Sequence, residues 1–303
     1  MTAGIAIKLI LELFIKIMQQ NEQGIIDDLD TEYLHDFRVA VRRTRAVLSQ
    51  LQIIFQPATA KKFKKDFSFI GKQSNQLRDL DVYLLNEQTY KNMLPVQFRK
   101  TISELFDQLK EERQSAYQDF AAVLNSDRYK KIMINWIHFL NTKIIDIKTA
   151  TKAVGQPVVL VVKPIILNQL EIVLNLGNQI NEETEDKKVH DLRLECKKLR
   201  YLLEFFASLF PKKRMDTFID HLKILQDNLG KFNDYSVQQN FLQGYLKQHI
   251  ISDENDTHTI AGIGALIGIL YDKQMQTRRE FSIRYAQFAS KENITIAMKM
   301  FKS

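Results

Sequence analysis

The sequence has 303 residues, of which 45% are hydrophobic, enough for one large domain or two smaller ones. It contains 43 Lys and Arg against 36 Asp and Glu, and the formal net charge of +7 favours an anionic partner over a cationic one. The single cysteine, Cys196, excludes an intramolecular disulfide and favours a cytoplasmic protein.

The first predicted element is a helix over residues 3–18, AGIAIKLILELFIKIM. Lys8, Glu12 and Lys16 interrupt its apolar residues every four positions, which is typical of an amphipathic helix and not of a secretory signal. A late apolar run, IAGIGALIGILY over residues 260–271, is too short to span a bilayer. We therefore expect no membrane partner.

The second predicted helix, LHDFRVAVRRTRAVL over residues 34–48, has an apolar face and a basic one. At about 100° per residue, its core face comprises Leu34, Phe37, Val41, Thr44 and Leu48, and Leu51 continues it. His35, Arg38, Arg42 and Arg45 form one row beside that face, which we call the first ridge, whereas Arg43 points elsewhere. The ridge contains no carboxylate to relieve the repulsion among its cations, so we expect a polyanion to neutralise it.

More basic residues cluster on the helix predicted after the first ridge. Lys61, Lys62, Lys64 and Lys65 surround Phe63, which lies on the core side of that helix. Relative to Phe63, Lys62 is expected to flank the core and Lys65 to point outward. Arg78, further along the chain, could end the basic surface or have a local structural role, because its repeat equivalent is Asn233.

The whole pattern returns 155 residues later, in VHDLRLECKKLRYLLEFF, which begins at Val189. The offset maps the basic residues of the first helix onto His190, Arg193, Lys197, Lys198 and Arg200. We call His190, Arg193, Lys197 and Arg200 the second ridge. The core positions repeat too, with Val41 mapping onto Cys196, and residues 5–18 of the N-terminal helix map onto residues 160–173. The strand-like VVLVV in that region is therefore predicted to be helical.

This repeat indicates an internal duplication with a unit of about 155 residues, too long for a solenoid. We predict an all-α chain of two pseudo-symmetric antiparallel helical bundles, an N-terminal half over residues 1–150 and a C-terminal half over 151–303. Basic charge is concentrated in the repeat, because residues 34–78 hold ten Lys or Arg against two Asp or Glu, and residues 189–233 hold nine against six.

The paired helices, each followed by RDLDV or LQDNLGKFND, resemble the CHAD family, the conserved histidine α-helical domain. The resemblance covers nearly the whole chain, so residues 1–303 are expected to form one CHAD domain. It implies an all-helical protein with basic surfaces that bind inorganic polyphosphate. Since no catalytic or metal-ligating constellation is evident in the sequence, we expect a non-catalytic module without a cofactor or metal, in the cytoplasm or at polyphosphate granules. The expected polyphosphate-binding residues are His35, Arg38, Arg42, Arg43, Arg45, Lys62, Lys65, Arg78, His190, Arg193, Lys197, Lys198, Arg200 and Lys223.

Three other functions stay open at this point. Nucleic acid is a rival polyanion, although the aromatic residues near the ridges mostly lie at core positions and not where bases could stack. A phosphate-related enzyme could use the repeated histidines, but Glu32, in the spacing Glu-x-x-His with His35, is replaced by Lys187 in the second copy, which disfavours a paired metal site. A helical scaffold without a ligand is the third alternative, and it predicts that the ridge arginines are dispensable.

Overall fold

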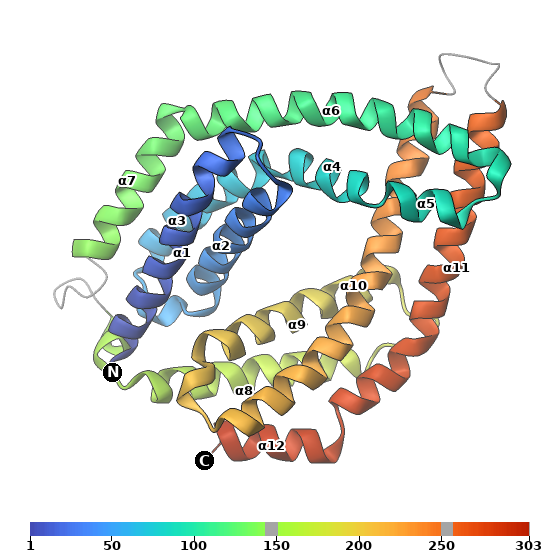
Figure 1. The fold of residues 1–303 in the computed structure, drawn as a ribbon. Helices are drawn as coiled ribbons and strands as arrows, with labels where there is room; N and C mark the ends of the chain where they lie inside the picture. The colour runs from blue at the N-terminus through green and yellow to red at the C-terminus, as the bar shows by residue number, and fades with distance from the viewer. Residues whose placement is uncertain (143–150, 250–256, 303) are drawn as a thin grey trace. The chain divides into compact units, whose positions relative to one another are not determined.

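A computed structural model describes residues 1–142, 151–249 and 257–302, and these residues confirm the all-α prediction (Figure 1). They contain α-helices and short 3₁₀ turns and no β-strand. The α-helices are α1 (Ala3–Ile26), α2 (Thr31–Gln50), α3 (Pro57–Gln73), α4 (Asn75–Leu85), α5 (Glu87–Met93), α6 (Arg99–Asn125), α7 (Asp127–Thr142), α8 (Val158–Gly177), α9 (Asp186–Phe206), α10 (Lys212–His249), α11 (Thr257–Phe288) and α12 (Lys291–Phe301).

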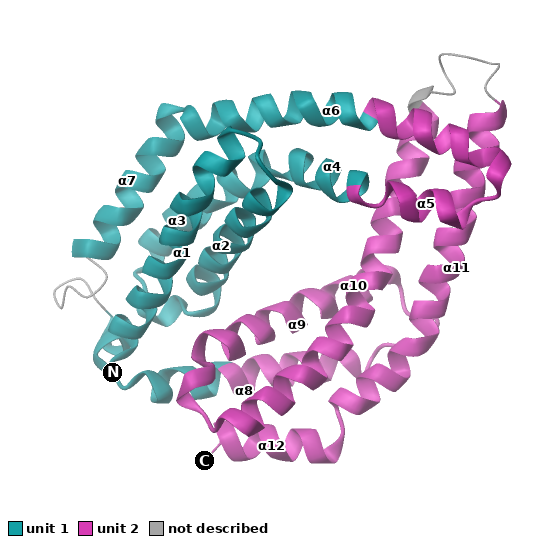
Figure 2. Ribbon diagram, in the orientation of Figure 1, with its two compact units in different colours: residues 1–84, 109–165 teal, residues 85–108, 166–303 magenta. Residues whose placement is uncertain are grey.

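The helices group into two compact units (Figure 2). The first unit comprises residues 1–84 and 109–165, and the second comprises residues 85–108 and 166–303. The segment 85–108, which contains α5 and the start of α6, thus packs with the second unit although it lies early in the chain. The predicted boundary after residue 150 lies outside the described residues.

In three pairs of helices, the first residues are separated by the offset of the sequence repeat. α1 and α8 start at Ala3 and Val158, α2 and α9 at Thr31 and Asp186, and α3 and α10 at Pro57 and Lys212, each pair 155 residues apart. The VVLVV segment is accordingly helical, as predicted. The repeat differs at Ser74, where α3 ends and α4 begins one residue later, whereas α10 runs unbroken past the equivalent Leu229. The buried Ser74 hydroxyl donates to the Gly71 carbonyl oxygen, a local hydrogen bond that competes with continuation of the helix.

In the first unit, α2 packs against α1 and α3, and α7 covers α3. The predicted core face of α2 is buried throughout, from Leu34 to Leu51, so the ridge beside it points away from the core. Trp136 of α7 lies edge-on to Phe63 and Phe67 of α3, with ring centroids 4.7 and 5.1 Å apart. These aromatic contacts set the rotation of α3 and with it the direction in which its lysines point.

The core of the second unit uses the equivalent positions of α9 and α10, closed by α11 and α12. Cys196 is buried, which confirms its predicted core position. Phe218 of α10 contacts Phe288 of α11 and Phe301 of α12 at centroid distances of 5.7 and 6.2 Å.

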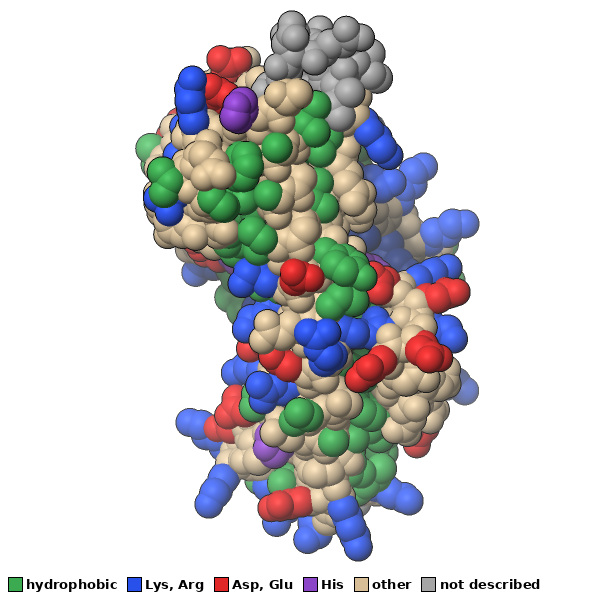
Figure 3. Space-filling view, turned by 90° about the vertical axis from the view of Figure 1, so that its right-hand side faces the viewer, with side chains coloured by type: hydrophobic (Ala, Val, Ile, Leu, Met, Phe, Trp, Pro, Cys, Tyr) green, Lys and Arg blue, Asp and Glu red, His purple; other side chains and the backbone are tan. Residues whose placement is uncertain are grey.

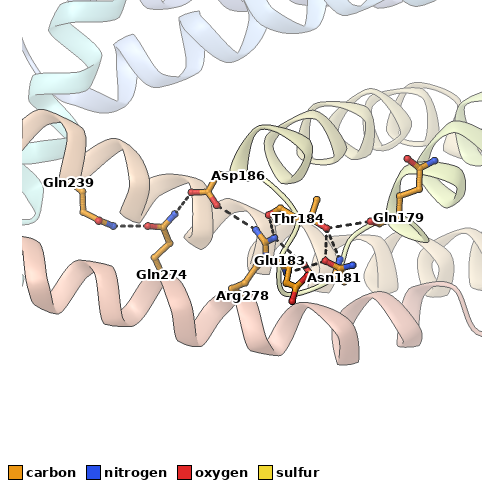
Figure 4. Close-up of polar contacts among 8 residues, drawn as sticks. All are labelled: Gln179, Asn181, Glu183, Thr184, Asp186, Gln239, Gln274 and Arg278. Carbon is orange, nitrogen blue, oxygen red and sulfur yellow. Dashed lines mark hydrogen bonds and ion pairs between the residues drawn. The ribbon is translucent and has the colours of Figure 1, made fainter.

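A polar network in the second unit holds the loop between α8 and α9 (Figure 4). Arg278 of α11 donates hydrogen bonds to the backbone carbonyl oxygens of Asn181 and Thr184 and pairs with Asp186 at 3.5 Å. Gln274 donates to Asp186 at 3.0 Å and accepts from Gln239 of α10 at 2.8 Å. Because Asp186 is the first residue of α9, the network anchors the start of the helix that carries the second ridge.

Among the residues that the structure describes, one helix, α8, is long and apolar enough to cross a membrane by length and composition. A single such helix is weak evidence, because a core helix of a soluble protein passes the same test. Val162, Ile166, Leu170 and Val173 of α8 are fully buried at helical spacing, as in a core helix.

Candidate functional site

The first ridge borders a groove between α2 and α3 in the first unit. The groove has a volume of about 290 Å³ and contains no Asp or Glu in its lining. Its lining consists of Arg38, Val41, Arg42 and Arg45 from α2, Ser68, Gly71 and Lys72 from α3, and Asn75 from the start of α4. Four of these eight residues are cations, so the groove is suited to an anion.

Arg38 is the anchored member of the ridge. Its guanidinium donates hydrogen bonds to the carbonyl oxygen of Gly71 at 3.1 Å, to the hydroxyl of Ser74, and to Oδ1 of Asn75 at 3.0 Å. All three partners are neutral. Burial lowers the pKa of Arg38, and Asp79 opposes this effect, but an arginine remains protonated under all ordinary conditions. Arg38 therefore brings positive charge to the groove while it ties α2 to α3 and α4.

Arg42, Arg45 and Lys72 are the unpaired cations of the groove. All three are exposed, and none forms a hydrogen bond or ion pair with another residue in the described part of the chain. Their donors are therefore available to a ligand. A guanidinium can bind two phosphate oxygens at once, whereas the ammonium of Lys72 acts as a point charge.

His35 lies at one end of the ridge and contacts Arg78. A guanidinium nitrogen of Arg78 lies 2.7 Å from Nδ1 of His35. Burial lowers the pKa of His35, and the charge of Arg78 lowers it further, while Glu32 and Asp36 act in the opposite direction. Arg78 is thus joined to the first ridge by a direct contact with its histidine.

The remaining predicted residues of the first unit lie outside the lining of the groove. Arg43 is half-buried on another side of α2. Lys62 is exposed, with Nζ 5.3 Å from the centroid of the Phe63 ring. Lys65 is exposed on the same side of α3 as Lys72, seven residues further along. The sequence analysis did not predict Lys72 as a binding residue, although its spacing of seven residues from Lys65 places both on one face of the helix.

In the second unit, two cations of the second ridge and the predicted binding residues Lys198 and Lys223 have acidic partners. Lys198 pairs with Glu195 at 2.5 Å, Arg200 with Glu204 at 2.9 Å, and Arg193 with Asp234 at 3.8 Å. Arg200 also donates to Oε1 of Gln226 at 3.0 Å, and Lys223 pairs with Asp220 at 3.4 Å. His190 lies 2.7 Å from Oδ1 of Asn233, and Lys197 is half-buried.

Basic side chains are common elsewhere on the surface as well. On the face shown in Figure 3, Lys and Arg side chains are interspersed with Asp and Glu. The groove in the first unit is therefore distinguished by cations without carboxylate partners, and not by the mere presence of basic residues.

Comparison with protein families identifies this arrangement of helices. The family model for the CHAD domain matches residues 9–243, which is more than half of the chain. The chain belongs to the CHAD family. The first ridge and its counterpart on α9 both lie within the matched CHAD region. A comparison with curated proteins found no match.

Two solved structures share the CHAD fold of this chain. The CHAD domain from the plant Ricinus communis is 23% identical, with a TM-score of 0.77 over 95% of this chain and 92% of that one. PptA from Streptomyces chartreusis is 14% identical, with a TM-score of 0.74 over 94% of this chain and 99% of that one. At these identities the likeness establishes the fold and not the ligand.

Proposed function

We propose that this protein binds inorganic polyphosphate in the groove between α2 and α3 and does not turn it over. The family is known in general to bind polyphosphate, which supports the choice of ligand. The observation that carries the proposal is a groove lined by Arg38, Arg42, Arg45 and Lys72 without a carboxylate.

The spacing of the cations suits a linear chain of phosphates. Residues three and four positions apart on a helix lie about one turn, roughly 5.4 Å, apart along the axis, so Arg38, Arg42 and Arg45 form a row parallel to α2. Lys72 approaches from the opposite wall of the groove. A flexible polyanion can thus contact both walls at once. Each of its phosphates that meets a cation releases bound counterions, which favours binding.

The groove suits a phosphate chain better than single-stranded nucleic acid. Its lining includes no aromatic side chain on which a base could stack. The nearest aromatic residue of α2, Phe37, is fully buried in the core. Weak, salt-sensitive binding of nucleic acid is still expected, since the phosphates of DNA and RNA meet the same cations.

We also propose that the protein acts in the cytoplasm and accumulates at polyphosphate granules. The single buried cysteine agrees with a reducing compartment. Fluorescent fusions of the wild type and of a variant with an altered groove test this. Foci that coincide with polyphosphate only for the wild type would support the proposal, and a diffuse wild type would contradict it.

A competition titration tests the ligand. Labelled long-chain polyphosphate is competed with tripolyphosphate, ATP and single-stranded DNA at near-physiological salt. We expect tripolyphosphate, ATP and DNA each to displace the labelled long chain only weakly, because more phosphates of the long chain can meet the groove cations. If DNA competes equally well, the surface is a general polyanion binder and the proposal fails.

Matched variants test the location of the site. The groove variant carries Arg42→Ala, Arg45→Ala and Lys72→Ala, and the control carries Lys16→Ala, Lys130→Ala and Lys131→Ala, which are exposed lysines of the first unit outside the groove lining. Both variants lose three positive charges. We expect the affinity to fall strongly only in the groove variant. Equal losses would assign binding to net charge. Release of orthophosphate from polyphosphate by the wild type would overturn the non-catalytic part of the proposal.

A further inference from the structure

The helices that follow the two ridges carry opposite charges at equivalent positions. On α3, Lys61, Lys65 and Lys72 lie on one face, since they are spaced by four and seven residues. The same positions on α10, 155 residues later, are Asp216, Asp220 and Asp227. All six side chains are exposed. A row of three cations in the first unit is therefore a row of three carboxylates in the second.

The ridge helices differ in the same direction. Glu195 and Glu204 of α9, which pair with Lys198 and Arg200, replace the uncharged Ala40 and Ser49 of α2. Both pairs lie within one turn of their own helix, at spacings of three and four residues. The helices α9 and α10 thus carry five carboxylates at positions where α2 and α3 carry none: Glu195, Glu204, Asp216, Asp220 and Asp227.

We propose that the two ridges have diverged, so that the groove of the first unit binds the polyanion and the second ridge is neutralised by its own carboxylates. This inference rests on the proposed function and specifies which half performs it. Glu204 takes for Arg200 the role that a ligand phosphate takes in the first unit, and Glu195 takes it for the neighbouring Lys198.

The physical reason is the electrostatic cost of a phosphate in the second unit. A phosphate near Arg200 or Lys198 must displace or approach Glu204 or Glu195, and like charges at close distance repel. Cations already paired with carboxylates hold few counterions, so binding there releases few of them. In the first unit, Arg42 and Arg45 have no such competitor among the described residues.

A matched pair of double variants tests the divergence. One variant carries Arg42→Gln and Arg45→Gln, and the other carries the equivalent changes Lys197→Gln and Arg200→Gln. With tripolyphosphate and long-chain polyphosphate as ligands, we expect at least a tenfold loss of affinity for the first variant and less than a twofold loss for the second. The slope of log K against log salt concentration should become shallower in the first variant only, by about 0.7 for each phosphate that it no longer neutralises. Equal losses of affinity would overturn the inference.

A gain of binding provides the second test, which does not depend on removing a cation. Asp216→Lys, Asp220→Lys and Asp227→Lys rebuild on α10 the lysine row of α3. Isothermal titration with tripolyphosphate should give one site per wild-type chain and two per variant chain. The control carries Glu111→Lys, Glu112→Lys and Asp119→Lys at exposed positions of α6, with the same change in charge, and should keep one site.

The outcomes separate this inference from the proposed function. If the wild type binds no polyphosphate, the proposed function fails. If the wild type binds two tripolyphosphates, or if the lysine row on α10 adds no site in a variant whose helicity by circular dichroism is unchanged, the divergence fails while polyphosphate binding stands.

Discussion

Arg78 contacts Nδ1 of His35 at 2.7 Å, and this contact determines the tautomer of the histidine. A guanidinium has only donors, so Nδ1 must accept, and the proton of the neutral ring lies on Nε2. In the second unit the equivalent position, also 43 residues after the histidine, is Asn233. The first histidine is therefore held neutral beside a cation, with an N–H left to donate to a ligand.

His35 should make polyphosphate binding pH-dependent. Its pKa is lowered in the free protein by burial and by Arg78. A bound polyanion stabilises the imidazolium and raises this pKa, so protons are taken up on binding and the affinity rises as the pH falls. We expect tighter binding at pH 5.5 than at pH 7.5 in the wild type and a smaller difference in His35→Gln.

The pKa itself can be followed by NMR in the same proteins. Arg78→Gln keeps a donor to Nδ1 but removes the charge, so the pKa of His35 should move toward its ordinary value without reaching it, because burial remains. An unchanged pKa in Arg78→Gln, or an affinity equal at both pH values in the wild type, would contradict this account.

Alanine substitutions at Arg38 and Arg42 should differ in their effect on stability, although both should weaken binding. Arg38→Ala removes hydrogen bonds to Gly71, Ser74 and Asn75, and bonds to a charged group are each worth about 1.5–3 kcal/mol. Arg42 is exposed and unpaired among the described residues, so Arg42→Ala should change the free energy of unfolding by no more than about 0.5 kcal/mol. Urea denaturation measures both. Binding should weaken in both variants, and a destabilised Arg42→Ala would refute its role as a free ligand-binding residue.

Arg113 of α6 should be a principal stabilising residue of the first unit. It pairs with Asp28 at 2.6 Å and with Asp81 at 2.8 Å, and the Asp81 side chain is only 1% exposed. Arg113→Ala leaves a buried carboxylate without its cation, which should cost about 3–5 kcal/mol in the free energy of unfolding. Arg113→Ala with Asp81→Asn should recover part of this stability. Equal stability of the single and double variants would show that Asp81 is not the source of the cost.

Substitution with alanine should have opposite effects on protein stability at two glycines. A Cβ at Gly177 of α8 would overlap the ring of Tyr285, whose hydroxyl donates to the carbonyl oxygen of Leu174 at 2.8 Å. Gly177→Ala should therefore destabilise the protein by about 1–3 kcal/mol through overpacking. A Cβ at Gly264 of α11 meets no atom within 4 Å, so Gly264→Ala should stabilise by about 0.5–1 kcal/mol through helix propensity. Thermal or urea unfolding checks both, and a neutral Gly177→Ala would mean that Tyr285 can move aside.

The sequence alone predicted most of the fold and the residues of the first ridge. The 3.6-residue period located the core face of α2, from Leu34 to Leu51, and the offset of 155 residues located the second copy. The first is set by the geometry of a single helix, and the second is a repeat within the sequence itself. The ion pairs of Glu195 with Lys198 and of Glu204 with Arg200 lie within one helix turn. Their spacing in the sequence could have predicted them, although the sequence analysis did not use it.

By itself, then, the sequence determined which residues share a face of one helix, because backbone geometry sets that relation within a few turns. Only the tertiary structure decided which faces of different helices meet. Packing of Phe63 and Phe67 against Trp136 turned α3 so that Lys72 lines the groove and Lys62 does not. The contacts of His35 with Arg78 and of Arg193 with Asp234 likewise join residues more than forty positions apart. Such contacts depend on how side chains interlock between helices, which no local period records.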